Sequence, residues 1–199
     1  SFVLCYFDES VQHDRWGCLH ADDHRAELAA LASLLLEDPS VALVVKSQFE
    51  RNSPSRLYAG DALFERARAT GRYVELCVGS HRNIVFPAEA ALSADLCIGH
   101  LIGATASLEA ALAGVCSVLL NPTGLRTDWD SIYARADIVY PSMQALLEAI
   151  VAARRGGTTH ASLGDWSTIL PEFDGFRDGR AAQRLRELIE RCVRPEQCA

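Results

Sequence analysis

Lysine is almost absent from this 199-residue chain, which has a single lysine, Lys46, against eighteen arginines and a formal net charge of −7. An acidic chain without a basic cluster does not suit a phosphate backbone, so we expect no nucleic-acid partner. Long apolar runs are also missing. No stretch approaches the ~20 residues that are needed to span a bilayer, so we expect no transmembrane segment.

The seven cysteines include no Cys-x-x-Cys pair, which argues against a zinc or dithiol redox site. Cys5, Cys77, Cys97 and Cys116 lie instead in apolar, strand-like runs, where a free thiol packs as a small hydrophobe. Unpaired cysteines fit a reducing compartment, and we expect a cytoplasmic protein.

Three familiar site motifs are missing as well. The sequence has no G-x-x-x-x-G-K-[ST], no G-x-G-x-x-G after the first strand and no G-x-S-x-G, which argues against a P-loop NTPase, a dinucleotide-binding enzyme and an α/β-hydrolase. His20 and His24 have the i,i+4 spacing of a helical metal site. Asp22 and Asp23 between them look like helix N-caps, so we expect a solvated helix start and no metal.

What the sequence does contain is an alternation of apolar runs and amphipathic segments. Helices are predicted from about Asp22 to Glu37, around 60–70, at 87–93 and from Ser142 to Arg154. Parallel neighbouring strands require such crossovers, so the fold class is α/β, a doubly wound, mostly parallel, six-stranded Rossmann-like sheet with helices on both faces. The six strands are predicted at residues 2–8, 41–46, 73–78, 95–99, 115–120 and 137–140.

These elements predict a single domain over residues 1–199, with a core at about 1–155 and a helical tail at about 165–195. The tail includes an amphipathic helix from Asp178 to Arg194. The first apolar run begins directly after Ser1, from which we expect a domain excised from a longer protein.

The most informative stretch runs from Asp95 to Pro122, DLCIGHLIGATASLEAALAGVCSVLLNP. It reads as strand, glycine-containing loop, helix and strand, with Thr105 or Ser107 as helix cap and Gly114 at a left-handed C-cap. A helix that starts beyond the carboxyl end of a strand points its free N–H groups into the crevice above the sheet, where α/β proteins hold phosphates. These residues equally suit a purely structural helix.

Polar residues follow the other predicted strands too, at the edge where parallel strands end. Taken singly, each is more often structural than functional. Their convergence on one edge favours a nucleotide diphosphate or a similar doubly charged ligand. The candidates are Asp8, Glu9, Ser10, Lys46, Ser47, Gly79, Ser80, His81, Arg82, Gly99, His100, the loop 103–107, Glu109, Asn121 and Thr123.

The stretch resembles the nucleotide-binding C-terminal domain of GT-B glycosyltransferases, and most of all bacterial proteins that build capsule and other surface polysaccharides. VVKS at 44–47 resembles the family's strand that ends in a basic residue, and FDGFRDGRAAQRLRELI resembles its closing segment. The resemblance touches most of residues 41–190. It departs at Cys116, where the family usually has proline, and in basic pairs reduced to Lys46 and Arg82. The matching pieces are Asp95, Thr105 with Ser107, Glu109-Ala110 and Ala113-Gly114.

The resemblance implies one half of a GT-B fold that holds a nucleotide-sugar, with a UDP-sugar expected first, and pairs with an N-terminal half that is absent from this chain. The acceptor would be a carbohydrate or a lipid-linked molecule, and the protein could be peripheral at the inner face of the membrane. The resemblance implies no required cofactor and names no catalytic residue. A 2-epimerase-like enzyme and a non-catalytic binding module remain alternatives. From the strand ends and the resemblance together we predict that the nucleotide-sugar is bound by Lys46, Ser80, His100, Gly103, Thr105, Ser107 and Glu109.

Overall fold

The computed structural model describes residues 1–8, 19–48, 52–76, 85–156 and 163–193. In these residues, six strands form one sheet in the order β3-β2-β1-β4-β5-β6, and every neighbouring pair is parallel. The predicted fold class is confirmed. The strands are β1 (Phe2–Phe7), β2 (Val41–Lys46), β3 (Tyr73–Leu76), β4 (Leu96–His100), β5 (Ser117–Leu120) and β6 (Val139–Tyr140).

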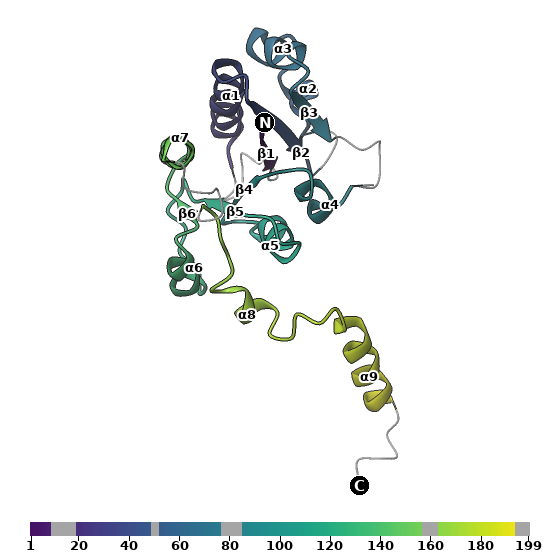
Figure 1. Cartoon of the computed structure of the whole chain (residues 1–199). Helices are drawn as coiled ribbons and strands as arrows, with labels where there is room; N and C mark the ends of the chain where they lie inside the picture. The colour runs from purple at the N-terminus through teal and green to yellow at the C-terminus, as the bar shows by residue number, and fades with distance from the viewer. Residues whose placement is uncertain (9–18, 49–51, 77–84, 157–162, 194–199) are drawn as a thin grey trace.

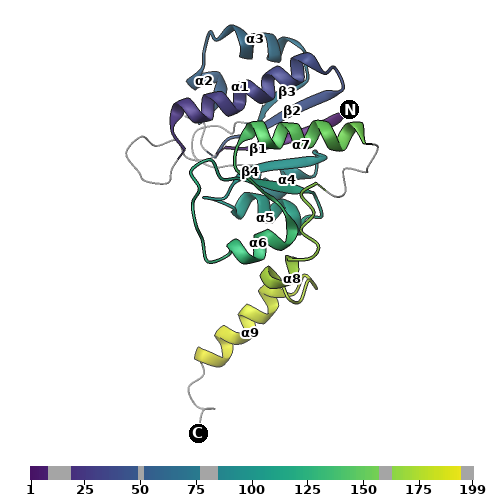
Figure 2. The same ribbon diagram turned by 90° about the vertical axis from the view of Figure 1, so that its left-hand side faces the viewer.

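Helices cover both faces of this sheet (Figures 1 and 2). The short α2 and α3 join β2 to β3, whereas α8 and α9 follow the sheet in the chain. In Figure 2, α1 and α7 lie side by side across one face. The helices are α1 (Ala21–Glu37), α2 (Pro54–Leu57), α3 (Ala62–Ala69), α4 (Pro87–Ala91), α5 (Thr105–Leu112), α6 (Asp130–Ala136), α7 (Met143–Arg155), α8 (Leu170–Phe173) and α9 (Ala181–Val193).

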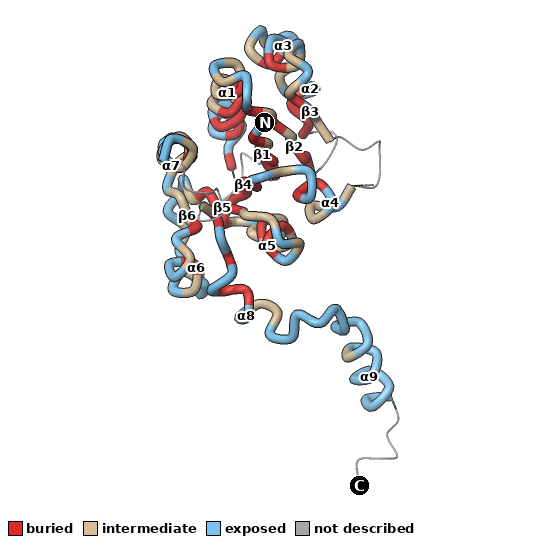
Figure 3. Tube along the Cα trace, in the orientation of Figure 1, coloured by how far each residue is buried: buried red, intermediate tan, exposed pale blue. Residues whose placement is uncertain are grey.

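The core is divided between the two faces because successive side chains of a strand point in opposite directions. Leu4 and Tyr6 of β1 pack with residues of α1, α3 and α7. Cys5 and Phe7, which alternate with them, pack with residues of α4 and α5. Nearly continuous burial along β1, β4 and β5 is typical of parallel strands covered on both faces (Figure 3).

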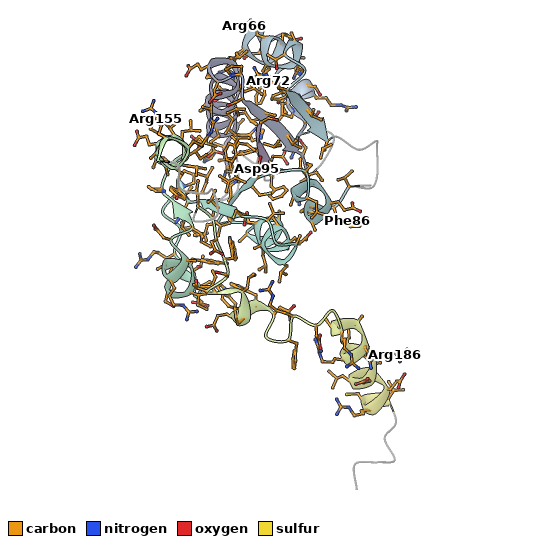
Figure 4. All side chains as sticks on the ribbon, in the orientation of Figure 1. Arg66, Arg72, Phe86, Asp95, Arg155 and Arg186 are labelled. Carbon is orange, nitrogen blue, oxygen red and sulfur yellow. The ribbon has the colours of Figure 1, made fainter. Side chains whose placement is uncertain are left out.

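Asp95, which is labelled in Figure 4, connects the start of β4 to β1. Its Oδ2 accepts a hydrogen bond from the backbone N–H of Val3 at 2.7 Å. The backbone N–H of Asp95 in turn donates to the carbonyl of Val3. This exchange fixes where β4 starts to pair with β1.

Two of the predicted helix caps are wrong. The N-cap of α1 is His20, and the exposed Asp22 and Asp23 lie in the first turn. Carboxylates there interact favourably with the positive end of the helix dipole. The N-cap of α5 is Ala104, and no side chain caps the helix. Gly114 does adopt the expected left-handed conformation, with φ of 84°, after the C-cap of α5.

α9 projects away from the rest of the molecule (Figures 1 and 3). None of its residues is buried, although Leu185, Leu188 and Ile189 are apolar. In Figure 4, Arg186 on α9 lies at the opposite end of the molecule from Arg66 on α3. The core of the sheet and its helices therefore contains no residue of α9.

Candidate functional site

The strand order reverses direction between β1 and β4. β2 and β3 extend the sheet on one side of this pair, and β5 and β6 extend it on the other. The chain therefore leaves β1 and β4 in opposite directions at their carboxyl ends. In open α/β sheets, ligands bind in the crevice that this divergence creates.

The N-terminus of α5 lies at this edge, since α5 begins only five residues after β4 ends at His100. Gly103 is exposed and has φ of 117°, a backbone conformation that only glycine adopts freely. Thr105 is exposed as well, and the first turn of α5 contains no acidic residue. The free backbone N–H groups at the start of α5 can therefore bind an anion without repulsion from a neighbouring carboxylate in that turn.

Lys46 is the last residue of β2 and is only 4 % exposed. Its Nζ donates a hydrogen bond to the carbonyl of Ser47 at 2.9 Å. Lys46 is level with Phe7 in the neighbouring strand, whose side chain packs on the α4 and α5 face. The lysine therefore places its positive charge beneath the edge of the sheet, on the side that α5 covers.

Ser107 and Glu109 sit differently on α5. Ser107 is fully buried, its Oγ lies 3.4 Å from the carbonyl of Val118, and its own carbonyl accepts a hydrogen bond from Ser117. Its hydroxyl thus belongs to the contact between α5 and the sheet. Glu109 is partly exposed, and its side chain forms no hydrogen bond or ion pair with any described residue. Its carboxylate is available to a ligand.

A buried polar cluster that the sequence analysis missed lies on the opposite face of the sheet. The hydroxyl of Tyr6 donates to Oε2 of Glu27 at 2.7 Å, and Nε2 of His100 lies 2.8 Å from the same oxygen. His100 is only 2 % exposed. The available signal was the helical spacing of Glu27, which shares the buried side of α1 with Leu28 and Leu31.

His24 extends this cluster toward α2. Its Nδ1 shares a 2.7 Å hydrogen bond with the hydroxyl of Tyr58, and its ring contacts Tyr6. Burial lowers the pKa of His24 from 6.5 to about 4, although the nearby Glu27 opposes this shift. His24 is therefore neutral at pH 7.

Two of the other predicted residues, Asn121 and Asp8, hydrogen-bond to nearby backbone. Asn121 braces its own loop, since its amide exchanges two hydrogen bonds with the backbone of Leu125. Asp8 is buried and accepts a hydrogen bond from the backbone N–H of Gln48. The predicted residues that lie outside the described part of the chain are Glu9, Ser10, Gly79, Ser80, His81 and Arg82.

The described residues contain no group of three or more histidine, cysteine or carboxylate side chains that could hold a metal ion. His20 and His24, which have the spacing of a helical metal site, do not share one environment, because His20 is exposed and His24 is buried. The arrangement at the edge of the sheet thus offers a helix N-terminus, a lysine charge, a free carboxylate and a buried imidazole.

No family model matches this sequence, and no curated protein matches it significantly. Solved structures do match its fold. The C-terminal domain of a glycosyl transferase group 1 family protein, LpcC from Francisella tularensis, is 13% identical with a TM-score of 0.54, and the match covers 87% of this chain and 86% of that domain. The fold is that of a GT-B C-terminal domain.

Two further structures have the same fold. The C-terminal CMP-Kdo binding domain of WaaA from Acinetobacter baumannii is 13% identical with a TM-score of 0.52, and the match covers 81% of this chain and 84% of that domain. A mutant O-GlcNAc transferase from Thermobaculum terrenum is 20% identical with a TM-score of 0.56, and the match covers 96% of this chain but 35% of that protein. In the described residues, no helix is long and apolar enough to cross a membrane.

Proposed function

We propose that this chain is the donor-binding half of a glycosyltransferase and that it holds a nucleotide-sugar at the carboxyl edge of β1 and β4. The observation that carries the proposal is the exposed N-terminus of α5 at the point where the strand order reverses, in a fold shared with glycosyltransferase C-terminal domains. One of these, the WaaA domain, is described as binding CMP-Kdo.

The diphosphate would lie at the N-terminus of α5, where Gly103 and Thr105 are exposed and where the backbone N–H groups of the first turn face it. Lys46 would add its positive charge through space from beneath the edge. Together they would offset the negative charge that develops on the nucleotide as it leaves the sugar, so the reaction needs no metal ion. The hydroxyl of Ser107 is turned into the sheet contact, and only its backbone N–H contributes.

Glu109 would accept hydrogen bonds from the ribose or the donor sugar. It lies one turn into α5 with an unpaired carboxylate, so it is able to meet a hydroxyl group next to the diphosphate. The finer assignments follow from the sequence resemblance: a UDP-sugar as donor, an absent N-terminal half that supplies the catalytic base and the acceptor site, and a role in capsular or other surface polysaccharide synthesis at the inner face of the membrane.

The test is isothermal titration calorimetry of the chain with UDP-, GDP-, CMP- and dTDP-sugars. We expect one nucleotide class to bind, and Glu109→Ala to weaken its binding by ~1–3 kcal/mol with the melting temperature unchanged. Glu37→Ala is the matched control, because Glu37 is an exposed glutamate at the far end of α1. If none of the nucleotide-sugars gives a heat of binding, the proposal is wrong.

A turnover assay separates the alternatives. Without the second half, the chain should bind donor but neither transfer nor hydrolyse it, because orientation and the base come from across the cleft. Epimerised nucleotide-sugar among the products would identify the 2-epimerase-like enzyme instead. If the full-length protein also binds donor without any turnover, the non-catalytic binding module is the better description.

A further inference from the structure

Three buried polar side chains from different elements meet beneath the carboxyl edge of the sheet. Tyr6 comes from β1, Glu27 from α1 and His100 from the end of β4. The carboxylate oxygen Oε2 of Glu27 joins the other two, at 2.7 Å from the tyrosine hydroxyl and 2.8 Å from Nε2 of the imidazole. The side chains of His100 and Glu27 are 2 % and 7 % exposed, so this connection is shielded from water.

These contacts determine which ring nitrogen of His100 carries the proton. Burial and the charge of Glu27 raise the pKa of Tyr6, which therefore remains a hydrogen-bond donor. An ionised carboxylate only accepts hydrogen bonds, so Nε2 of His100 must donate to it. In the neutral ring, the proton then resides on Nε2 and Nδ1 presents a lone pair.

Nδ1 of His100 is buried and has no hydrogen-bond partner among the described residues. A buried polar atom without a partner is unfavourable, and a ligand that offers a donor would relieve this cost. His100 is also one of the residues that line a small pocket at the carboxyl ends of β4 and β5, together with Leu19, Ile102 and Thr123. The unpartnered nitrogen thus belongs to a side chain that borders the candidate site.

His100 and the N-terminus of α5 lie on opposite faces of the sheet, so they would contact different parts of a ligand. His100 follows Leu96 and Ile98 in alternation and therefore lies on the face of α1 and α7. The N-terminus of α5, which suits the diphosphate, belongs to the opposite face. A ligand that bridges the edge would bring an uncharged, hydroxyl-bearing part toward His100.

We propose that His100 accepts a hydrogen bond through Nδ1 from a hydroxyl group of the bound nucleotide-sugar, and that Glu27, held by Tyr6, is the positioning residue that fixes the tautomer and orientation of the ring. This inference rests on the proposed function, because both need a ligand in the same crevice. A conformationally fixed acceptor would favour ligands that present a hydroxyl group at this point over analogues that lack it.

The first test uses the chain with ¹⁵N-labelled histidine and reads the tautomer of His100 in long-range ¹H–¹⁵N spectra, with His100→Gln to assign the signals. The free protein should show a protonated Nε2 and an unprotonated Nδ1. UDP-N-acetylglucosamine, GDP-mannose and CMP-sialic acid are then titrated in turn. The probe that binds should shift the Nδ1 resonance, because a hydrogen bond to its lone pair changes its shielding.

The second test compares Glu27→Gln with Glu37→Gln, the same change at the exposed end of α1. A glutamine amide both donates and accepts, so the tautomer of His100 should become mixed in the first variant and stay fixed in the second. Loss of the fixed acceptor should weaken binding of the probe by about 5- to 10-fold, the equivalent of one hydrogen bond. Tyr6→Phe, which keeps the shape of the core, serves if Glu27→Gln does not fold. Glu27 remains an acceptor in this variant, so Nε2 of His100 should stay protonated, but the carboxylate loses the hydroxyl that holds it and binding of the probe should weaken. Unchanged binding in Tyr6→Phe would overturn the part that Tyr6 plays in holding Glu27.

The outcomes separate this inference from the proposed function. A probe that binds by calorimetry without moving Nδ1 overturns the role of His100 and leaves the donor site intact. Full affinity and an unchanged tautomer in Glu27→Gln overturn the positioning role of Glu27. If no probe produces heat or shifts any resonance, the proposed function and this inference fail together.

Discussion

At the residue scale, the side of α1 that faces the sheet is unusual because its first two turns bury ionisable groups instead of aliphatic ones. His24 and Glu27 occupy positions that Leu28, Leu31 and Leu35 continue along the helix. Burial of such groups is unfavourable unless they are hydrogen-bonded. Glu27 is bonded to Tyr6, and Nδ1 of His24 to Tyr58, whereas Nε2 of His24 has no partner among the described residues. The arrangement makes this end of α1 sensitive to pH.

The first prediction concerns acid stability. Desolvation lowers the pKa of His24 from 6.5 to about 4, so protonation favours the unfolded chain. The stability is fully present above pH 6.5 and is lost as the pH falls toward 4. Between pH 7.5 and 4.5 the contribution amounts to about 2–3 kcal/mol, at ~1.4 kcal/mol per unit of pKa shift. Urea denaturation at a series of pH values measures it.

His24→Gln should remove most of this pH dependence, whatever its effect on stability at neutral pH. Glu27, His100 and Tyr58 face the ring and stay in place in the variant. His20→Gln, at an exposed position one turn earlier, should leave the dependence intact. An equal slope in wild type and His24→Gln would show that another group carries the acid sensitivity.

At the scale of the element, α5 approaches β4 closely because residue 99 has no side chain. A Cβ atom placed on Gly99 would lie 2.5 Å from Oγ of Ser107, which is far closer than real contacts allow. At this point α5 and β4 lie too close together for a side chain at residue 99.

We expect Gly99→Ala to destabilise the chain by about 1–3 kcal/mol through overpacking. Adding Ser107→Ala should recover much of this loss, since it removes the atom that the new methyl group meets. Gly114→Ala is the comparison, because a Cβ there meets nothing within 4 Å and acts only through its φ of 84°. A double-mutant cycle by urea denaturation measures the coupling, and additive effects at Gly99 and Ser107 would contradict the packing argument.

The sequence predicted the elements well and the caps poorly. Periodicity and apolar runs report burial directly, so the six strands and the left-handed Gly114 were found. Thr105 and Ser107 have the composition of helix caps, but packing of α5 on Gly99 directs Ser107 into the sheet. Local propensity was overridden by a tertiary contact, which no pattern within the helix reveals.

The candidate site was predictable to a similar extent. Polar residues at the predicted strand ends, His100 among them, do lie at one edge, because the carboxyl ends of parallel strands meet at the same side of a sheet. Their part in binding stays a prediction. The partners of His100 were missed, since Glu27 and Tyr6 lie 73 and 94 residues away along the chain and meet it only in the folded sheet. The contacts that orient a site are the part least visible to sequence periodicity.

At the scale of the whole molecule, the core is complete without α9. The apolar residues of α9 are half or more exposed, with Leu185 at 57 %, Leu188 at 50 % and Ile189 at 52 %. A contiguous exposed apolar face is characteristic of an interaction surface. In the proposed two-domain enzyme, it would be available to contact the absent half.

The last prediction follows from this exposure. The triple variant Leu185→Ala, Leu188→Ala, Ile189→Ala should keep the free energy of unfolding within about 0.5 kcal/mol of wild type, because none of these side chains is buried. Leu146→Ala, on α7, removes a fully buried leucine and should cost about 2–5 kcal/mol. Urea denaturation compares the two. A loss of 2 kcal/mol or more in the triple variant would mean that α9 folds back onto the domain in solution, and its apolar face would then be part of the core.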